Sequence, residues 1–457
     1  MDRIIELLNL EDPNIIVSDI SIEGNTKFVT LETKPSIHFC PRCCYRMHSK
    51  GIRTRKVNHP ILQDTYSLVL VLKQRRWKCT NTECGFESNE AFNFVKPGRR
   101  NTNAADFLIV DAFRDLNATA SSIAKRFNTT DTNVLDIFDR YVHLDRLPLT
   151  DAISVDEVHI DMDTNCRYAL VIQDFHSGDP IDMLISRRNS ITEPYFASIP
   201  KEERYAVKYL ISDMYNPYIN YVNKYFPNAV SVVDSFHVIQ WIVRELDTFL
   251  KLLMRRFKQR DEEKQQQMSL LHGRAVTLPI SDEVYLLKKY RWLILMNQSS
   301  ISYHSDTRFD FHFRYFMNTY DYESKLMDLN PHLRTLRDYK EMYVRFNSDY
   351  AGDPVGAAKR LDWLIQFYYN SNYDVFIRFA ALLNAHRDSI INSFIMTSRI
   401  GSGGIYDSRL SNGPIESMNR KVKDLKRIGR GFRNFEHLRN RFLFSTRKLP
   451  VLNGSHY

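Results

Sequence analysis

The succession of short apolar segments between residues 153 and 233 is the feature that most constrains the fold of this chain. It predicts three consecutive strands joined by turn-rich connections, at 153–160, 167–173 and 181–186. It then predicts a helix, a strand, a helix and a strand, at 193–203, 207–212, 217–225 and 229–233. An antiparallel meander followed by alternating helices and strands is typical of an α/β core with one mixed sheet.

The residues on either side of this core have different patterns. A β-rich run at 66–72 predicts a small β module that ends at a Pro97-Gly98 break, and helical patterns fill 101–143. After Phe236, apolar residues recur at helical spacing to about residue 396. We therefore expect a multidomain α/β chain with five segments, 1–98, 99–148, 149–236, 237–400 and 401–457. In this division an all-helical segment is inserted into the core. The core resumes after a flexible break at 401–404, and its last element is a basic helix at 414–427.

Two short-spaced cysteine pairs lie in the first segment. Cys40-Pro41-Arg42-Cys43 precedes the β-rich run, and Cys79 and Cys84 follow it. Four thiolates presented by two turns are ligands of a structural zinc ion, so we expect one Zn²⁺ per chain in a zinc-ribbon-like module. Disulfide bonds are the alternative, but the first residues do not read as an export signal, which favours zinc. Cys44 and Cys166 fall outside the pairs and are interpreted as small core residues.

Residues 119–138 have the pattern of a helix-turn-helix. Ala124 is small enough for two short helices to approach closely, and Thr119 and Asp131 suit helix N-caps. A generic helical hairpin is the alternative. If the second helix enters a DNA groove, its expected base contacts come from Thr130, Thr132 and Asn133.

The charge balance favours a polyanionic partner, because Lys and Arg total 63 against 54 for Asp and Glu. Basic side chains that could bind phosphates lie between the cysteine pairs, at Arg53, Arg55, Lys56, Arg75 and Arg76. Others lie on the last basic helix, at Arg420, Lys421 and Lys423. A solvated surface is the alternative for such runs. No apolar run reaches the roughly 18 residues that cross a bilayer, which argues against a membrane protein.

Three acidic residues are candidate ligands of divalent cations. Asp156 lies in the first core strand and Asp213 directly follows the fourth, so the two meet at one sheet edge if those strands are neighbours. Glu416, on the last basic helix, could complete the site, although an acidic residue in a first helical turn also complements the helix dipole. Two Mg²⁺ or Mn²⁺ ions at such carboxylates activate a water or a DNA 3′-hydroxyl for phosphoryl displacement.

Asp234 and His237 share one turn after the last core strand. They could be metal ligands or a general base, but an Asp ahead of a helix is most often an N-cap and a nearby His often packs against the core. We therefore expect them to support the site by holding its ligands in place.

Several motifs together resemble the ISL3 family of bacterial insertion-sequence transposases, which belong to the DDE class. They are the cysteine motif with Arg75-Arg76-Trp77-Lys78-Cys79, the helix-turn-helix, Val155-Asp156-Glu157, Ser212-Asp213-Met214, Val233-Asp234-Ser235-Phe236-His237-Val238 and Ser411-Asn412-Gly413-Pro414-Ile415-Glu416-Ser417-Met418-Asn419. The resemblance covers nearly the whole chain. It implies a ribonuclease-H-like core in which Asp156, Asp213 and Glu416 are the catalytic triad.

The expected function is that of a cytoplasmic bacterial transposase. It would bind the terminal inverted repeats of its insertion sequence and target DNA. In the DNA complex it would be a homo-oligomer, most simply a dimer. It would cleave and transfer DNA strands with two divalent cations in each active site. The alternatives are a DNA-binding repressor or domesticated transposase without cleavage, and a nuclease without strand transfer. The presence of all three acidic candidates favours the transposase.

Overall fold

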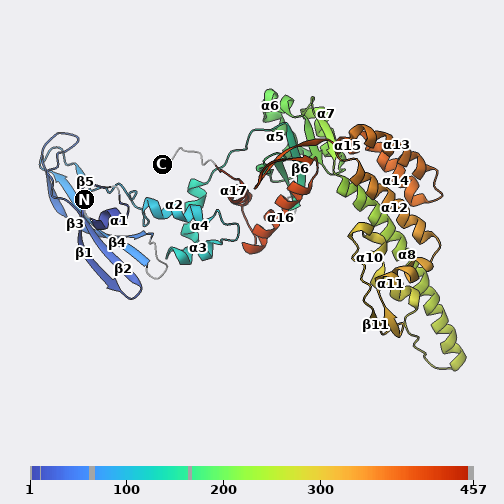
Figure 1. Ribbon diagram of the computed structural model, residues 1–457. Helices are drawn as coiled ribbons and strands as arrows, with labels where there is room; N and C mark the ends of the chain where they lie inside the picture. Colours follow the sequence, from blue (N-terminus) through green and yellow to red (C-terminus); the bar gives the residue numbers. More distant parts are fainter. Residues whose placement is uncertain (1–2, 11, 61–66, 163–166, 451–457) are drawn as a thin grey trace. The chain divides into compact units, whose positions relative to one another are not determined.

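The computed structural model describes residues 3–10, 12–60, 67–162 and 167–450, and the chain forms two compact units built from helices and strands (Figure 1). The first unit contains Met1–Leu147, Val158–Tyr168 and Arg420–Tyr457. The second contains Pro148–Glu157 and Ala169–Asn419. Cys166, one of the expected core residues, lies outside the described residues.

A five-stranded sheet opens the first unit. After helix α1 (Arg3–Leu7), its strands are β1 (Ile15–Glu23), β2 (Thr26–Thr33), β3 (Met47–His59), β4 (Ser67–Cys79) and β5 (Glu87–Asn89). The order is β1-β2-β4-β3, with β5 also paired to β4. Val57, Leu70 and Leu72 are fully buried, and together with Leu31 they form the apolar core of the sheet. β3 and β4 extend beyond this core as an antiparallel ribbon, which ends where Met47 pairs with Cys79.

Three helices follow the sheet, α2 (Asn103–Ala112), α3 (Ala120–Arg126) and α4 (Asp131–Tyr141). The Thr119 side chain caps α3, as its N-cap position predicts. The cap of α4 is Thr130 and not Asp131, because Thr130 is still extended and its hydroxyl accepts a hydrogen bond from the Asn133 N–H at 3.3 Å. α17 (Phe435–Thr446) completes this small core, since Phe138 of α4 lies 5.9 Å from Phe444 between ring centroids.

The second unit is centred on a mixed five-stranded sheet in the order β10-β9-β6-β7-β8. The strands are β6 (Ala152–His159), β7 (Tyr168–Asp174), β8 (Pro180–Leu184), β9 (Tyr209–Ser212) and β10 (Val230–Val233). β6, β9 and β10 pair in parallel, and β7 and β8 pair antiparallel. Every residue of β8 is buried, as in a sheet covered on both faces. The predicted succession of strands is therefore present.

The connection before β9 contains two helices where one was expected at 193–203. They are α5 (Asn189–Ser198) and α6 (Lys201–Ala206), and α7 (Asn216–Tyr225) follows β9. Pro200 causes the break, because its ring disfavours helical backbone at the preceding residue, and Ile199 is indeed extended with ψ 136°.

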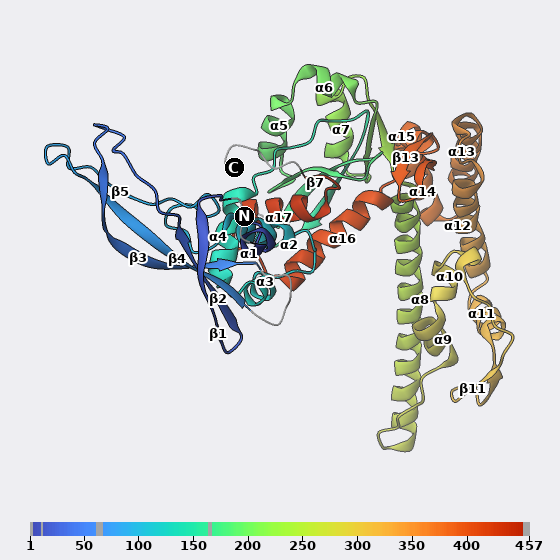
Figure 2. The ribbon, with the colours of Figure 1, turned by 60° about the vertical axis from the view of Figure 1, so that its left-hand side comes forward.

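A long, mostly helical insertion separates β10 from the return of the chain (Figure 2). Its helices are α8 (Ser235–His272), α9 (Asp282–Tyr290), α10 (Trp292–Leu295), α11 (Thr319–Asp328), α12 (His332–Asp349), α13 (Pro354–Tyr369), α14 (Asp374–Ala385) and α15 (Arg387–Asn392), with a 3₁₀ turn at Gln298–Ser300. α8 is the spine. One apolar cluster joins its first half to α12, α13 and α14, and a second joins Leu250 and Leu253 to α9, α10 and α11.

The sequence predicted an all-helical insertion, but the insertion also contains two β-hairpins. β11 (Arg308–Asp310) and β12 (Tyr315–Met317) form a hairpin whose three-residue strands are too short to display a period of two. β13 (Met396–Gly401) and β14 (Gly404–Arg409) form another, so the expected flexible break is a hairpin turn. Gly404 has φ 113°, a backbone conformation that favours glycine. The chain then enters α16 (Gly413–Ile428), close to the predicted basic helix.

Candidate active site

Three aspartates lie on three neighbouring strands of the parallel part of the sheet, Asp156 within β6 and Asp213 and Asp234 directly after β9 and β10. β6 and β9 pair in register up to Ser154 and Ile211, and Asp156 and Asp213 each come two residues later. Asp234 directly follows β10, the strand on the other side of β9. Because parallel strands end at the same edge of a sheet, the register places these three residues toward one edge. Among the described residues, however, the predicted ligands Asp156, Asp213 and Glu416 do not form a group whose donor atoms all lie within 4.8 Å of one another.

The carboxyl group of Asp156 is surrounded by other carboxylates. Burial raises its pKa, and a hydrogen bond from the Glu157 N–H at 2.8 Å opposes this. The negative charges of Asp213, Glu157 and Glu416 raise it further, so that the pKa is about 7. Asn419 Nδ2 donates to Asp156 Oδ2 at 2.8 Å and fixes the carboxylate. Carboxylates held together against their mutual repulsion are a suitable donor set for a divalent cation.

The start of α16 carries Glu416 to the same sheet edge. Asp234 Oδ1 accepts a hydrogen bond from the Asn412 backbone N–H at 3.2 Å, which ties the residue before the helix to the end of β10. Glu416 Oε1 then lies 3.6 Å from His237 Nε2, in the first turn of α8. This distance exceeds a hydrogen bond, and within the described residues the buried Nε2 atom has no hydrogen-bond partner.

Asp234, His237 and Glu416 form a cluster of three potential metal ligands. One donor atom from each lies within 4.8 Å of the others, a spacing compatible with a divalent cation. Burial raises the pKa of Asp234, which the Asn412 N–H and the nearby His237 oppose. The two residues expected to support the site are thus as close to Glu416 as ligands of one ion would be.

Sequence reasoning missed the residues that hold Asp156 and Glu157. Glu157 accepts a hydrogen bond from the buried Tyr218 hydroxyl at 2.7 Å and pairs with Arg187 at 2.5 Å. Asn419 reaches both Asp156 and the Glu157 carbonyl oxygen. The signal was available, because Glu157 and Asn419 stand within the motifs that carry the two catalytic candidates next to them.

A family model described as a transposase, DDE_Tnp_ISL3, matches residues 153–442, which is more than half of the chain. The chain belongs to the ISL3 transposase family. It is accordingly a DNA transposase, an enzyme that acts on DNA and belongs to a class that uses divalent metals. None of the curated proteins matches the chain. Among the described residues, no helix is long and apolar enough to cross a membrane.

The first unit of the transposase holds the four paired cysteines in one cluster. Their sulfur atoms all lie within 4.8 Å of one another, and the Sγ atoms of Cys40 and Cys84 are 3.7 Å apart. In a tetrahedron with zinc–sulfur bonds of about 2.3 Å, sulfur atoms are about 3.8 Å apart. The cluster therefore fits a zinc ion. Cys44 is exposed and has φ 59°, so its interpretation as a core residue was wrong.

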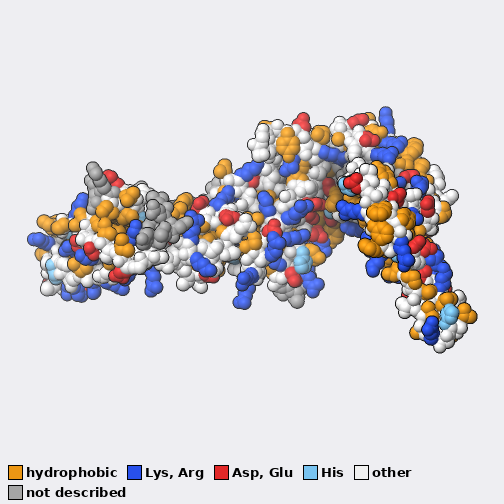
Figure 3. Space-filling model, turned by 60° about the horizontal axis from the view of Figure 1, so that its bottom comes forward, with side chains coloured by type: hydrophobic (Ala, Val, Ile, Leu, Met, Phe, Trp, Pro, Cys, Tyr) orange, Lys and Arg blue, Asp and Glu red, His pale blue; other side chains and the backbone are white. Residues whose placement is uncertain are grey.

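The β3–β4 ribbon of the transposase divides the predicted phosphate-binding residues between two faces. Gly51 pairs with Arg76 and Ile52 with Arg75, and side chains alternate along each strand. Arg53, Arg55 and Arg76 therefore share one face, and Lys56 and Arg75 share the other. The residues proposed from the sequence to bind phosphates are thus divided between two faces of the ribbon, and Lys and Arg side chains are spread over this part of the surface (Figure 3).

The other predicted DNA contacts lie on α4 and α16. Thr130 and Thr132 are exposed, but the Thr130 hydroxyl is used as the cap of α4. Asn133 is half-buried and donates from Nδ2 to the Thr129 hydroxyl at 2.8 Å. On α16, Arg420 and Lys423 are exposed and Lys421 is half-buried.

Proposed function

We propose that this transposase cleaves the ends of its insertion sequence and transfers the strands through Asp156, Asp213 and Glu416. The observation that carries the proposal is the parallel register of β6, β9 and β10. It brings acidic residues from separate parts of the chain to one edge of the sheet. The strand order β10-β9-β6-β7-β8, with an antiparallel β7–β8 pair, supports a ribonuclease-H-like core.

Two Mg²⁺ or Mn²⁺ ions bound at these carboxylates would activate a water or a 3′-hydroxyl and stabilise the leaving oxygen. The protein's own part is to hold the carboxylates oriented at one edge of the sheet. Asn419 fixes Asp156, and Asp234 fixes the start of the helix that carries Glu416. We propose that His237 orients Glu416, because its unpaired Nε2 atom lies 3.6 Å from that carboxylate.

DNA recognition is proposed to use the first unit. The four-cysteine cluster supports a zinc-stabilised ribbon, and the capped α3–α4 pair supports a helix-turn-helix that reads the terminal repeats. Arg420 and Lys423 on α16 are suited to hold phosphates of the strand being cut. A repressor without cleavage would need none of the carboxylates at the sheet edge, so their convergence favours the enzyme.

The test is to replace Asp156 and Asp213 by Asn and Glu416 by Gln, one at a time. Each change removes a ligating charge at nearly constant volume. We expect cleavage of the element ends to fall by more than the roughly 100-fold that loss of a supporting residue causes, with DNA binding unchanged. Gel assays of cleavage and anisotropy measurements of binding on the same DNA would separate the two effects.

Asp407→Asn and Glu436→Gln are matched controls, because these carboxylates lie on β14 and in the first turn of α17. Both variants should cleave like the natural protein. If Glu416→Gln cleaves normally, Glu416 merely complements the dipole of α16, and the third ligand must be another carboxylate, with Asp234 the first to test.

A further inference from the structure

The β11–β12 hairpin of the insertion exposes a cluster of phenylalanines. Phe309 and Phe316 are cross-strand partners with ring centroids 5.5 Å apart, and Phe311 lies 5.3 Å from Phe309. Their exposed fractions are 44%, 64% and 87%. Three large apolar side chains gathered on one short hairpin form a patch that proteins seldom leave in water without a partner.

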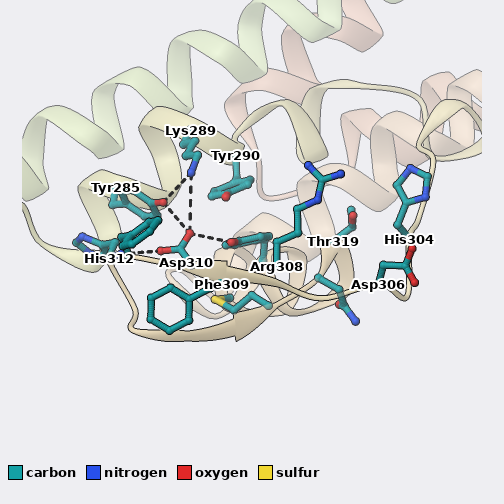
Figure 4. A pocket seen from close by; sticks show the side chains of 14 residues that line it. Tyr285, Lys289, Tyr290, His304, Asp306, Arg308, Phe309, Asp310, His312 and Thr319 are labelled. Atoms are coloured by element: carbon teal, nitrogen blue, oxygen red, sulfur yellow. Dashed lines mark hydrogen bonds and ion pairs between the residues drawn. The ribbon is translucent and has the colours of Figure 1, made fainter.

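The opposite face of the hairpin is fastened to the insertion. Asp310 is buried, and it accepts hydrogen bonds from the Tyr285 and Tyr322 hydroxyls, each at 2.7 Å (Figure 4). Burial alone would raise its pKa, but these two bonds and the N–H groups of His312 and Phe313 lower it to about 2. The carboxylate therefore remains charged and bonded, so α9 and α11 hold the hairpin in place while its phenylalanines face outward.

A cavity of about 1080 Å³ adjoins the hairpin. This is at the upper end of the roughly 300–1,000 Å³ typical of ligand sites. Aromatic rings form much of its wall, with Tyr290 and Tyr322 stacked at 3.8 Å. Its charged residues are Lys289, which lies 3.9 Å from Asp310, together with Asp306 and Arg308, and the Arg308 side chain extends from β11 into the cavity region in Figure 4.

The charge of the hairpin indicates which partner fits. Between Arg308 and Met317 the sequence contains two arginines and one acidic residue, the buried Asp310. Arg308 and Arg314 are exposed, and neither makes an ion pair within the part of the chain that the structure describes. Exposed aromatic rings interleaved with unpaired arginines are the combination with which proteins bind unpaired nucleotides, by stacking on the bases and pairing with the phosphates.

We propose that the β11–β12 hairpin and its cavity bind unpaired nucleotides of the DNA substrate by stacking bases on Phe309, Phe311 and Phe316. Bases in an intact duplex are already stacked on each other and cannot be reached in this way. The hairpin therefore acts on DNA whose strands are separated or cut. The inference rests on DNA being the substrate, and it adds a binding site outside both the carboxylate cluster and the first unit.

The test compares two DNA ligands with the full-length protein. One is a blunt duplex, and the other is the same duplex with a single-stranded tail that contains a fluorescent base analogue. The variant replaces Phe309, Phe311 and Phe316 by Ala. Because the stacking of a base on an aromatic ring contributes to affinity, we expect affinity for the tailed DNA to fall at least about ten-fold, with loss of the analogue's quenching. Affinity for the blunt duplex should stay unchanged.

Two further variants make the result specific. Replacing Leu270 and Leu271 by Ala removes exposed apolar side chains elsewhere on the insertion, 83% and 77% exposed, and should leave tail binding intact. Replacing the three phenylalanines by Leu keeps the apolar surface but removes the rings, and should weaken tail binding as the Ala variant does.

Three outcomes would overturn the proposal. Equal affinity of natural and Ala proteins for the tailed DNA would show that the rings bind no base. Full tail binding by the Leu variant would show that apolar contact suffices. A shift from dimer to monomer in the Ala variant, with tail binding unchanged, would make the patch an interface between two copies. A natural protein that binds neither DNA would instead contradict the proposed function.

Discussion

The raised pKa of Asp156 makes the stability of the metal-free transposase depend on pH. The pKa rises from its ordinary value of 3.8 to about 7 on folding. Between these values the folded state binds more protons than the unfolded state, so this contribution to stability is present at low pH and is lost as the pH rises to about 7. We expect the Tm in the presence of a chelator to fall over this interval, and Asp156→Asn to abolish that part of the fall.

Added Mg²⁺ should restore the Tm most strongly above this interval, where the carboxylates are charged and repel one another. Differential scanning calorimetry at several pH values measures both effects. A Tm in chelator that changes equally with pH in the natural protein and in Asp156→Asn would contradict this role for the carboxyl group.

The His237→Ala variant tests whether this residue, which lies beside Glu416, supports the site or binds the metal ion. As a positioning residue, its replacement by Ala should lower cleavage roughly 10–100-fold and weaken metal binding by a similar factor. The double variant with Glu416→Gln should be no less active than Glu416→Gln alone, because both changes affect one interaction. Metal titrations by calorimetry accompany the activity assay. Complete loss of cleavage in a folded His237→Ala protein would make this residue a direct ligand.

Residue types and strand order were enough to nominate Asp156 and Asp213 as candidates, because residues at matching positions of neighbouring parallel strands lie toward the same edge of the sheet. Glu416 needed the family resemblance as well. The hydrogen bonds of Asn419 and Asp234 could not be predicted, since they depend on where α16 packs after the whole insertion. Local patterns carry no information about such packing.

At the scale of single elements, we expect the folding of the cysteine-bearing end of the β3–β4 ribbon to depend on zinc. Its small cluster of Cys40, Met47 and Cys79 buries little apolar surface, so metal binding must supply much of its stability, about 10–16 kcal/mol in comparable zinc modules. Cys43→Ser should therefore lose the zinc and unfold this end, with the second unit still folded.

Zinc content by mass spectrometry and hydrogen exchange along the chain measure the two consequences. Cys44→Ser is the matched control, because this exposed neighbour lies outside the cluster. A natural protein without zinc would refute the assignment, and so would normal exchange in β3 of the Cys43 variant.

The elements that escaped sequence analysis share a physical cause. α8 is apparent in the sequence because it buries one face at helical spacing, and β7 because it is a continuous buried run of strand length. β11 and β12 have three residues each and are held by Asp310 and its tyrosine partners, which are distant in sequence. Such short hairpins are determined by tertiary contacts, and they include the hairpin proposed to bind unpaired DNA.

For the molecule as a whole, the split basic ribbon predicts which face meets DNA. Arg53 and Arg76 are exposed on one face, whereas on the other Arg75 is half-buried and the exposed Lys56 has its ammonium group over the Phe28 ring. We expect the pair Arg53→Gln and Arg76→Gln to reduce the salt dependence of duplex binding, by a log–log slope of about 0.9 for each phosphate that is no longer neutralised.

The pair Lys56→Gln and Arg75→Gln is the control with the same change of charge, and its slope should match that of the natural protein. Binding measured by anisotropy over a range of KCl concentrations gives the slopes. Identical reductions in both pairs would mean that net charge matters and the face does not. No reduction in either would remove the ribbon from the DNA interface.

The hydrogen bond between Asp234 and Asn412 joins residues 178 positions apart, so the chain that leaves the sheet after β10 is bound to the end of that strand again where it enters α16. The two ends of the insertion, which is called the cassette below, therefore lie next to each other. Because the entropy of closing a loop grows only logarithmically, each doubling of such a cassette costs about 0.6 kcal/mol. Evolution can therefore lengthen, trim or replace it while the carboxylates stay in register, so the catalytic chemistry and the handling of DNA strands are free to diversify separately within the lineage.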